Sequence, residues 1–84
     1  MNNAQLQHIK KLVKYLESIH ETPKMGRYGR AIYLELHEQS VWLLGQAALR
    51  KKLLELDYVD GKINVYKLTE QGHAFLIEYN SLLN

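Results

Sequence analysis

The chain has 84 residues, a net charge of +2 and no cysteine. This length fits one domain and excludes a multi-step enzyme with its own cofactor domain, and the lack of cysteine excludes both a disulfide framework and a cysteine-type zinc site. The sequence contains no continuous apolar run typical of a secretory signal or a membrane span, which predicts a cytoplasmic location and no membrane partner. We therefore expect residues 1–84 to form one domain.

The first predicted element is an amphipathic helix over residues 4–20. Apolar residues recur there at helical spacing, and lysines occupy the opposite face. The helix should end near Glu21, because Pro23 disfavours helical geometry in the residue before it. Residues 23–29 then form a basic connector rich in turn residues.

The pattern of residues 30–38 fits two structures. Ile32, Leu34 and Leu36 alternate as in a strand, whereas the composition and the elements that follow suit a short helix. We predict a helix here. A strand would leave a helix-turn-helix motif incomplete and would remove much of the support for DNA binding.

The third predicted helix runs to about Leu56, with Ser40 as its N-cap or as the turn residue before it. Gly45 costs roughly 1 kcal/mol relative to alanine inside a helix, so either two elements approach closely there or the helix begins later. A helical wheel divides the residues between two sides. The side expected to face the core holds Trp42, Gly45, Leu49, Leu53 and Leu56, and the side expected to face away holds Ala47, Arg50, Lys51 and Leu54.

A β-hairpin follows, because Asp60-Gly61 is the signal of a two-residue type I′ loop between two apolar runs. Side chains alternate between the two faces of a strand. The face toward the core would hold Val59, Tyr66 and Leu68. The outer face would hold Tyr58, Ile63 and Val65, an apolar surface of the kind that often marks an interface.

Thr69 is the expected N-cap of a last helix. The apolar residues of this helix recur at helical spacing, as do those of the first helix. The sequence gives nearly equal weight to two outcomes, in which these stripes pack within one chain or one of them pairs with a second copy. The apolar residues of the last helix are Phe75, Leu76, Tyr79, Leu82 and Leu83.

Charge is distributed unevenly along the chain. Residues 1–52 hold nine Lys or Arg and four Asp or Glu, a net charge of +5, whereas residues 53–84 hold two and five, a net charge of −3. A basic half favours a polyanionic partner, because neutralised phosphates release counterions. The alternative is an ordinary solvated surface whose charges are unevenly spread.

Residues 45–76 resemble the second half of a winged helix-turn-helix domain. A basic helix containing Ala48-Leu49-Arg50-Lys51-Lys52-Leu53 precedes a turn, a strand, a wing and a closing strand that reads Tyr66-Lys67-Leu68-Thr69-Glu70-Gln71-Gly72. This order is similar to that of MarR- and PadR-like regulators, and the resemblance is weak before residue 45. It implies an α+β fold with three helices, a short two-stranded wing and a C-terminal helix.

The resemblance also implies a sequence-specific protein that binds double-stranded DNA and acts as a repressor-like transcriptional regulator. Its third helix would enter the major groove, where Arg can pair with guanine and Gln with adenine through two hydrogen bonds each. A homodimer would present two such helices about one DNA turn, roughly 34 Å, apart. The residues expected at base edges or nearby phosphates are Gln46, Ala47, Arg50 and Lys51, and those expected at phosphates or the minor groove are Arg27, Arg30 and Lys62.

Two departures from the family pattern support an alternative function. The first turn of the recognition helix usually carries small or polar residues, but this chain has Trp42, Leu43 and Leu44 there. The wing is also short, with a single lysine near its tip. These features suit a phage- or plasmid-type accessory protein in which the winged fold binds another protein through these side chains and the outer hairpin face.

The sequence argues against catalysis and metal binding. The four histidines, His8, His20, His37 and His73, lie far apart and show none of the spacings that metal sites favour. No serine lies on a recognisable nucleophile elbow, and no glycine-rich phosphate loop follows a strand. We therefore predict that the protein is not an enzyme and binds no cofactor.

Overall fold

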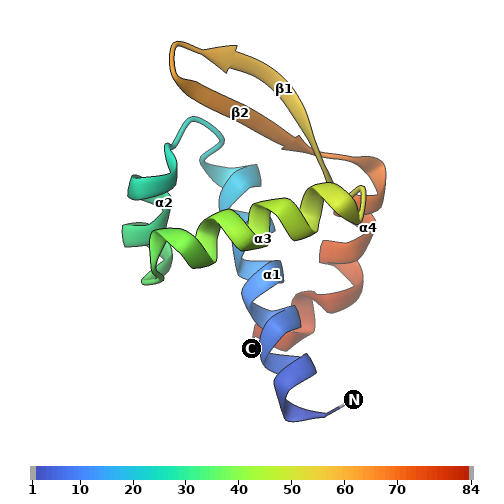
Figure 1. Cartoon of the computed structure of the whole chain (residues 1–84). Coiled ribbons are helices and arrows are strands. Elements are labelled where there is room, and N and C mark those ends of the chain that lie inside the picture. Colours follow the sequence, from blue (N-terminus) through green and yellow to red (C-terminus); the bar gives the residue numbers. More distant parts are fainter. Residues whose placement is uncertain (1, 84) are drawn as a thin grey trace.

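The computed structural model describes residues 2–83, and of residues 82 and 83 it describes the backbone alone. Leu82 and Leu83, two of the apolar residues predicted for the last helix, therefore have side chains outside the description. In Figure 1, α3 crosses in front of α1, with α2 on one side, α4 on the other and the hairpin above. The elements are α1 (Asn3–Glu21), α2 (Arg27–Leu34), α3 (Glu38–Arg50), β1 (Leu54–Asp60), β2 (Ile63–Leu68), α4 (Glu70–Tyr79) and the 3-10 helix η1 (Asn80–Leu83).

This element order confirms the predicted α+β fold, with three helices, a two-stranded wing and a C-terminal helix. α1 is central and packs against α2, α3, α4 and β2. A capping box starts it, because the Gln5 backbone N–H donates to Asn2 Oδ1 at 2.8 Å and the Asn2 backbone N–H donates to Gln5 Oε1 at 3.0 Å. The helix ends at Glu21, two residues before Pro23, as predicted.

α2 and α3 form the helix-turn-helix, so a helix was the right choice over a strand for the segment that follows the connector. Its predicted bounds, residues 30–38, were wrong, because α2 spans Arg27–Leu34. The connector predicted over residues 23–29 therefore ends before residue 27. α2 ends at Leu34, the turn passes through Glu35, whose φ of 58° is left-handed, and α3 begins at Glu38. Ser40 therefore lies inside α3 and is not its N-cap, so that prediction was wrong.

α3 also ends earlier than predicted. It stops at Arg50, and Lys52 turns the chain with a φ of 61° before β1 begins at Leu54. The wheel misplaced three side chains. Leu54 and Leu56 lie in β1 rather than in the helix, and Trp42 lies beside the buried face of α3, which consists of Val41, Leu44 and Ala48. Leu54, expected to face away, is buried, whereas Trp42 and Leu56, expected in the core, are 44% and 51% exposed.

The hairpin loop lies one residue later than predicted. Asp60 pairs with Ile63, so the loop consists of Gly61 and Lys62. A type I′ loop needs a positive φ at both central residues, but only Gly61, at 62°, has one. The expected Asp60-Gly61 type I′ loop is therefore wrong, and glycine at the first loop position is instead the pattern of a type II′ loop.

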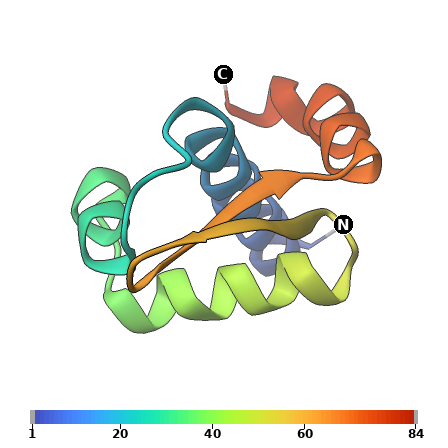
Figure 2. The same ribbon diagram turned by 90° about the horizontal axis from the view of Figure 1, so that it is seen from above.

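The two faces of the hairpin are also arranged differently from the prediction. A bulge at Asp57 shifts the register between Leu56 and Tyr58, and a one-residue shift exchanges the faces of a strand. Val65, predicted on the outer face, is 1% exposed, whereas Val59, predicted in the core, is 58% exposed. Seen from above in Figure 2, the hairpin lies over α1 and α3, and β2 packs against α1.

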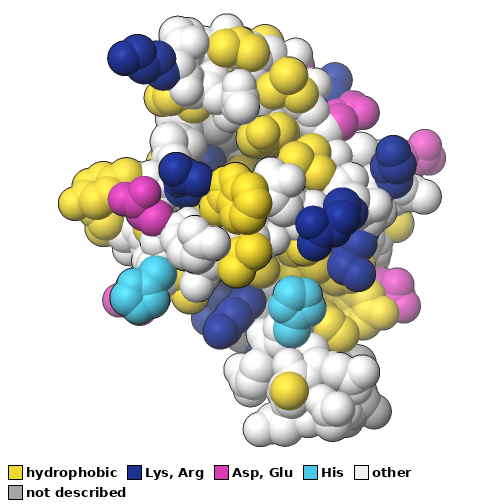
Figure 3. Space-filling model, in the orientation of Figure 1, with side chains coloured by type: hydrophobic (Ala, Val, Ile, Leu, Met, Phe, Trp, Pro, Cys, Tyr) yellow, Lys and Arg dark blue, Asp and Glu magenta, His cyan; other side chains and the backbone are white. Residues whose placement is uncertain are grey.

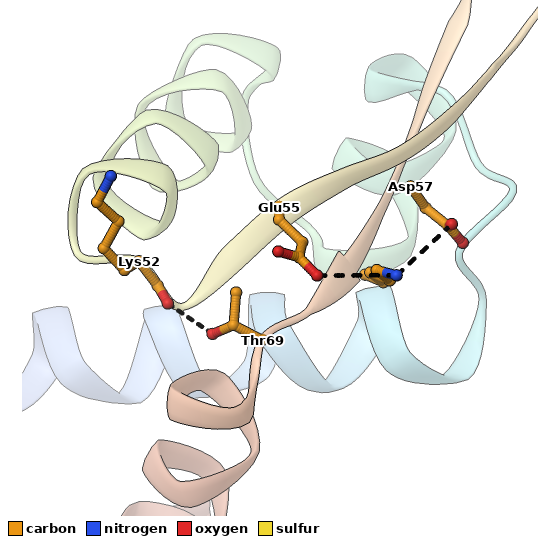
Figure 4. Close-up of polar contacts among 5 residues, drawn as sticks. Lys52, Glu55, Asp57 and Thr69 are labelled. Atoms are coloured by element: carbon orange, nitrogen blue, oxygen red, sulfur yellow. Dashed lines mark hydrogen bonds and ion pairs between the residues drawn. The ribbon is translucent and has the colours of Figure 1, made fainter.

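Hydrogen bonds of Thr69 connect the turn after α3 to the start of α4 (Figure 4), and we call this contact the joint between α3 and α4. The Thr69 hydroxyl donates to the Lys52 carbonyl at 2.5 Å and accepts from the Gly72 backbone N–H at 3.0 Å, so Thr69 is the N-cap of α4, as predicted. The Thr69 backbone N–H donates to the Leu53 carbonyl at 3.1 Å. This joint fixes the direction in which the hairpin and α4 leave α3.

Candidate nucleic-acid interface

The outward face of α3 lies opposite the side that the helix buries. Val41, Leu44 and Ala48 are buried in the core, in contact with α1 and neighbouring elements. With 3.6 residues per turn, the opposite side carries positions i, i+4, i+7 and i+11 counted from residue 39. Three of these four side chains are exposed and one is half-buried. We call this row the outward stripe: Gln39, Leu43, Gln46 and Arg50.

Two of the residues predicted to contact bases belong to the outward stripe. Gln46 and Arg50 lie one turn apart on it, Gln46 half-buried and Arg50 exposed. Ala47 lies on the flank of the stripe and is half-buried, and Lys51 is the exposed C-cap of α3.

Sequence reasoning missed Gln39 and Leu43 as members of the stripe. Gln39 was missed because the helix was predicted to begin at Ser40. Leu43 was missed because the predicted core face included Trp42, and Leu43 was assigned to neither side of the helix. The buried set Val41, Leu44 and Ala48 has the spacing of a helix face, and that spacing was the available signal.

Two of the predicted phosphate contacts lie on the surface. Arg27 opens α2, and its Nε lies 3.8 Å from Glu38 Oε2, with both side chains about half exposed. Such an exposed pair contributes only about 0–1 kcal/mol, so it does not prevent the Arg27 guanidinium from contacting another anion. Lys62 lies exposed at the tip of the hairpin.

Arg30, the third predicted phosphate contact, is a buried structural residue, and that prediction was wrong. Arg30 is 2% exposed. Nη1 donates to Ser18 Oγ at 3.1 Å, and Nη2 donates to the carbonyl of Thr22 at 2.7 Å and to that of Met25 at 3.4 Å. Burial lowers the pKa of the Arg30 guanidinium. The side chain thus links α2 to α1 and to the connector, and it is not available to DNA.

The connector, α3 and the hairpin border an open pocket of about 410 Å³. Its lining includes Tyr15 of α1, Arg30 of α2, Trp42 and Gln46 of α3, and Tyr66 of the hairpin. Burial raises the pKa of the Tyr15 hydroxyl to about 12, so this group is neutral at physiological pH. The ammonium group of Lys24 lies 5.9 Å from the centre of the Tyr58 ring, a further link between connector and hairpin.

The hairpin contributes little positive charge. Lys67 Nζ lies 3.7 Å from Glu55 Oε1 and 3.9 Å from Asp57 Oδ1, so two carboxylates compensate one cation. Asp60 adds a further negative charge beside the tip. Lys62 is therefore the principal cation that this wing offers to a polyanion.

The side chains expected to form a protein-binding surface are not all accessible. Leu44 and Val65 are buried, whereas Trp42 and Leu43 are about half exposed. Further large apolar side chains are exposed on α2, at Tyr28, Ile32 and Tyr33. Figure 3 views the side across which α3 runs and shows apolar side chains near its middle with Lys and Arg around them.

The described residues 2–83 hold no group of three or more His, Cys, Asp or Glu side chains arranged to bind a metal ion. His20 and His73 do meet, edge to face, with ring centres 5.3 Å apart. Over the same part of the chain, no helix combines the length and the apolar character that crossing a membrane requires.

No family model matches the chain, and its sequence matches no curated protein. In structure, the chain is similar to a mutant of S. aureus MepR, with a TM-score of 0.66 and 24% sequence identity. The match covers 98% of this chain and 58% of the MepR chain, so the present chain spans somewhat more than half the length of that protein. This likeness, together with the element order, shows that the chain has a winged-helix fold.

Proposed function

We propose that the protein binds double-stranded DNA in a sequence-specific manner and regulates transcription, as a repressor-like homodimer. One observation carries the proposal. The outward stripe of α3 displays two carboxamides and a guanidinium, the side chains best suited to pair with base edges, on the helix that follows the turn of the helix-turn-helix. The fold likeness to MepR supports the same conclusion.

The chemistry of the outward stripe matches that of the major groove, which is wide enough to admit an α-helix. The guanidinium of Arg50 can donate two hydrogen bonds to guanine, and the amide of Gln46 can pair with adenine, with roughly 1–3 kcal/mol of discrimination for each such pair. No Asp or Glu belongs to the stripe. Glu38, at the start of the helix, lies beside the stripe and 3.8 Å from the Arg27 guanidinium.

Cations beside the stripe are positioned for phosphates. Arg27 precedes it on α2, Lys51 follows it at the end of α3, and Lys62 extends from the hairpin tip. If these three neutralise one phosphate each, affinity per chain should fall roughly 40-fold between about 50 and 200 mM salt. The acidic hairpin implies that α3, rather than the wing, makes most of the contacts.

A second copy is expected at the end of the molecule away from the hairpin. In Figure 1, the first turns of α1 and the η1 helix lie at that end, so pairing there leaves α3 free. Ile77 of α4 is 81% exposed, which supports an apolar contact with a partner. Sedimentation velocity of the purified chain should show a dimer, and Ile77→Glu should favour the monomer.

The test of DNA binding is a fluorescence-anisotropy titration against random-sequence duplex at low and moderate salt. We expect salt-sensitive binding by the native chain and loss of binding in Arg50→Glu combined with Lys51→Glu. A matched control, Lys11→Glu combined with Lys14→Glu, makes the same change of charge on the exposed surface of α1. Absence of binding at about 50 mM salt, or equal losses in both double variants, would contradict the proposal.

The second candidate function is that of a protein-interaction module. The observation in its favour is that large apolar side chains are exposed on both helices of the motif, namely Tyr28 and Ile32 on α2 and Trp42 on α3. Under this function, Ile32→Asp should abolish binding to the protein partner, whereas the Arg50 and Lys51 reversals should have little effect. A DNA-binding protein should show the opposite pattern.

A further inference from the structure

The outward stripe of α3 contains one side chain that hydrogen bonding to DNA does not explain. Leu43 lies between Gln39 and Gln46 on the stripe and is 51% exposed. The next residue, Leu44, is buried in the core. An isobutyl group in the middle of a base-reading row can contribute only an apolar contact. Its place in the row therefore constrains what the row can read.

We propose that the outward stripe reads A·T base pairs, with Leu43 packed on the C5-methyl group of thymine and with Gln39 and Gln46 hydrogen-bonded to adenine. This inference rests on the proposed DNA-binding function and specifies its substrate as duplex DNA with thymine methyl groups exposed in the major groove. It assigns sequence discrimination to Gln39 and Leu43 as well as to Gln46.

The base edges supply the matching groups. The thymine methyl is the apolar group that the major groove offers. Adenine N7 accepts a hydrogen bond from the amide NH2 of a carboxamide, and adenine N6–H donates one to the amide oxygen. Since an A·T pair presents the methyl and these adenine atoms together, a carboxamide, an isobutyl group and a carboxamide in one row suit consecutive A·T pairs. The guanidinium of Arg50, at the end of the row, suits a flanking guanine.

The spacing along α3 agrees with the rise of DNA. Gln39 and Gln46 are seven residues apart, about 10.5 Å along a helix axis. This distance equals roughly three base-pair steps of 3.4 Å. Leu43 lies about 6 Å from the first amide and 4.5 Å from the second, so its contact falls on a base pair between those that the two amides reach.

The surroundings of the stripe favour DNA over an apolar protein surface as its partner. Burial of Gln39 and Gln46 against an apolar surface would leave their amide groups without hydrogen bonds, which is costly. Cations at Arg27 and Lys51 flank the row and match a phosphate backbone. A protein occupant is therefore treated as an outcome of the test.

The test begins with selection of duplexes of about 20 base pairs, two helical turns, from a random library by the native chain. A selected duplex is then synthesised with uracil in place of thymine, which removes the methyl groups and keeps every hydrogen-bonding atom. We expect selected sequences with consecutive A·T pairs and an affinity loss of about fourfold for each contacted methyl group. In Leu43→Ala the same replacement should change affinity less than about twofold.

A matched control separates this contact from general loss of apolar surface. Leu56→Ala also shortens a leucine that is 51% exposed, as Leu43 is, but on β1, so it should retain the full effect of uracil. Salt-sensitive DNA binding with no uracil effect, or an undiminished effect in Leu43→Ala, would overturn the inference and leave the proposed function standing. Absence of DNA binding, with binding of a protein that Leu43→Asp abolishes, would overturn both.

Discussion

Gly72→Ala is expected to destabilise the protein far more than the addition of one methyl group to a helix ordinarily does. Gly72 is buried in the first turn of α4, and a Cβ atom built there would overlap the backbone carbonyl oxygen of Leu53. That carbonyl accepts the Thr69 backbone N–H at 3.1 Å. The obstacle is thus backbone, held in place by the joint between α3 and α4, and no change of side-chain rotamer can relieve it.

The magnitude follows from three opposing effects. Alanine favours the helical state over glycine by about 0.5–1 kcal/mol. Forcing a methyl group into filled space costs about 1–3 kcal/mol, and a shift of α4 to relieve the overlap weakens the bond between Thr69 and Leu53, which is worth about 1 kcal/mol. The expected net loss is about 1–3 kcal/mol in the free energy of unfolding, or at least about 5 °C in Tm for a domain of this size.

Urea unfolding followed by far-UV circular dichroism and by the fluorescence of Trp42, the one tryptophan, gives this free energy directly. Gly29→Ala is the matched control, because Gly29 is also helical but a Cβ there would meet the flexible side chain of Met25. The control should cost less than about 0.5 kcal/mol, since helix propensity offsets the contact. A Gly72→Ala protein as stable as the native chain would refute the account of this joint.

Two further predictions concern the buried polar groups beside the pocket. Arg30→Met should lower the free energy of unfolding by about 2–4 kcal/mol in urea titrations, because it removes the donor to Ser18, Thr22 and Met25, whereas Arg27→Met at the surface should cost under about 1 kcal/mol. The Tyr15 hydroxyl is held neutral by burial, and its pKa of about 12 exceeds the value of 10.0 of the unfolded chain. The contribution of Tyr15 to stability should therefore be constant below pH 10 and fall by roughly 1.4 kcal/mol per pH unit between pH 10 and about 12, as the unfolded chain loses its proton first. Tyr15→Phe should remove this part of the alkaline loss, and equal alkaline slopes in both proteins would show that Tyr15 is not its source.

The elements that sequence predicted best are those whose signals are local. Pro23 marked the end of α1, and Thr69 marked the start of α4. The end of α3 has no such signal, because residues 48–56 contain neither glycine nor proline. The turn at Lys52 depends on a hydroxyl seventeen residues later in the chain, which donates to its carbonyl. A contact of that range cannot be read from a helical wheel.

The same reasoning explains which site residues were found. Gln46 and Arg50 were predicted correctly as outward-facing residues, because any helix that covers the basic segment places both opposite Ala48. Arg30 was misassigned because a cation directly after a basic connector resembles a surface residue, whereas it is a buried residue of α2. Its acceptors are mostly backbone carbonyls that composition does not reveal. Arg30 contacts no described carboxylate at ion-pair distance, so charge pairing gave no signal either.

The position at which α3 ends also connects the two proposed surfaces. Thirteen residues make this helix about 20 Å long, and it ends immediately after Arg50, so the outward stripe occupies its whole length. The turn at Lys52 is bonded to Thr69, the N-cap of α4, and α4 carries Ile77, which is proposed to contact a second copy. In the proposed dimer, a displacement of α4 is expected to reach α3 through this joint and through α1, which packs against both helices. A change at Gly72 or Thr69 is therefore expected to alter the separation of the two proposed recognition helices as well as the stability of the fold.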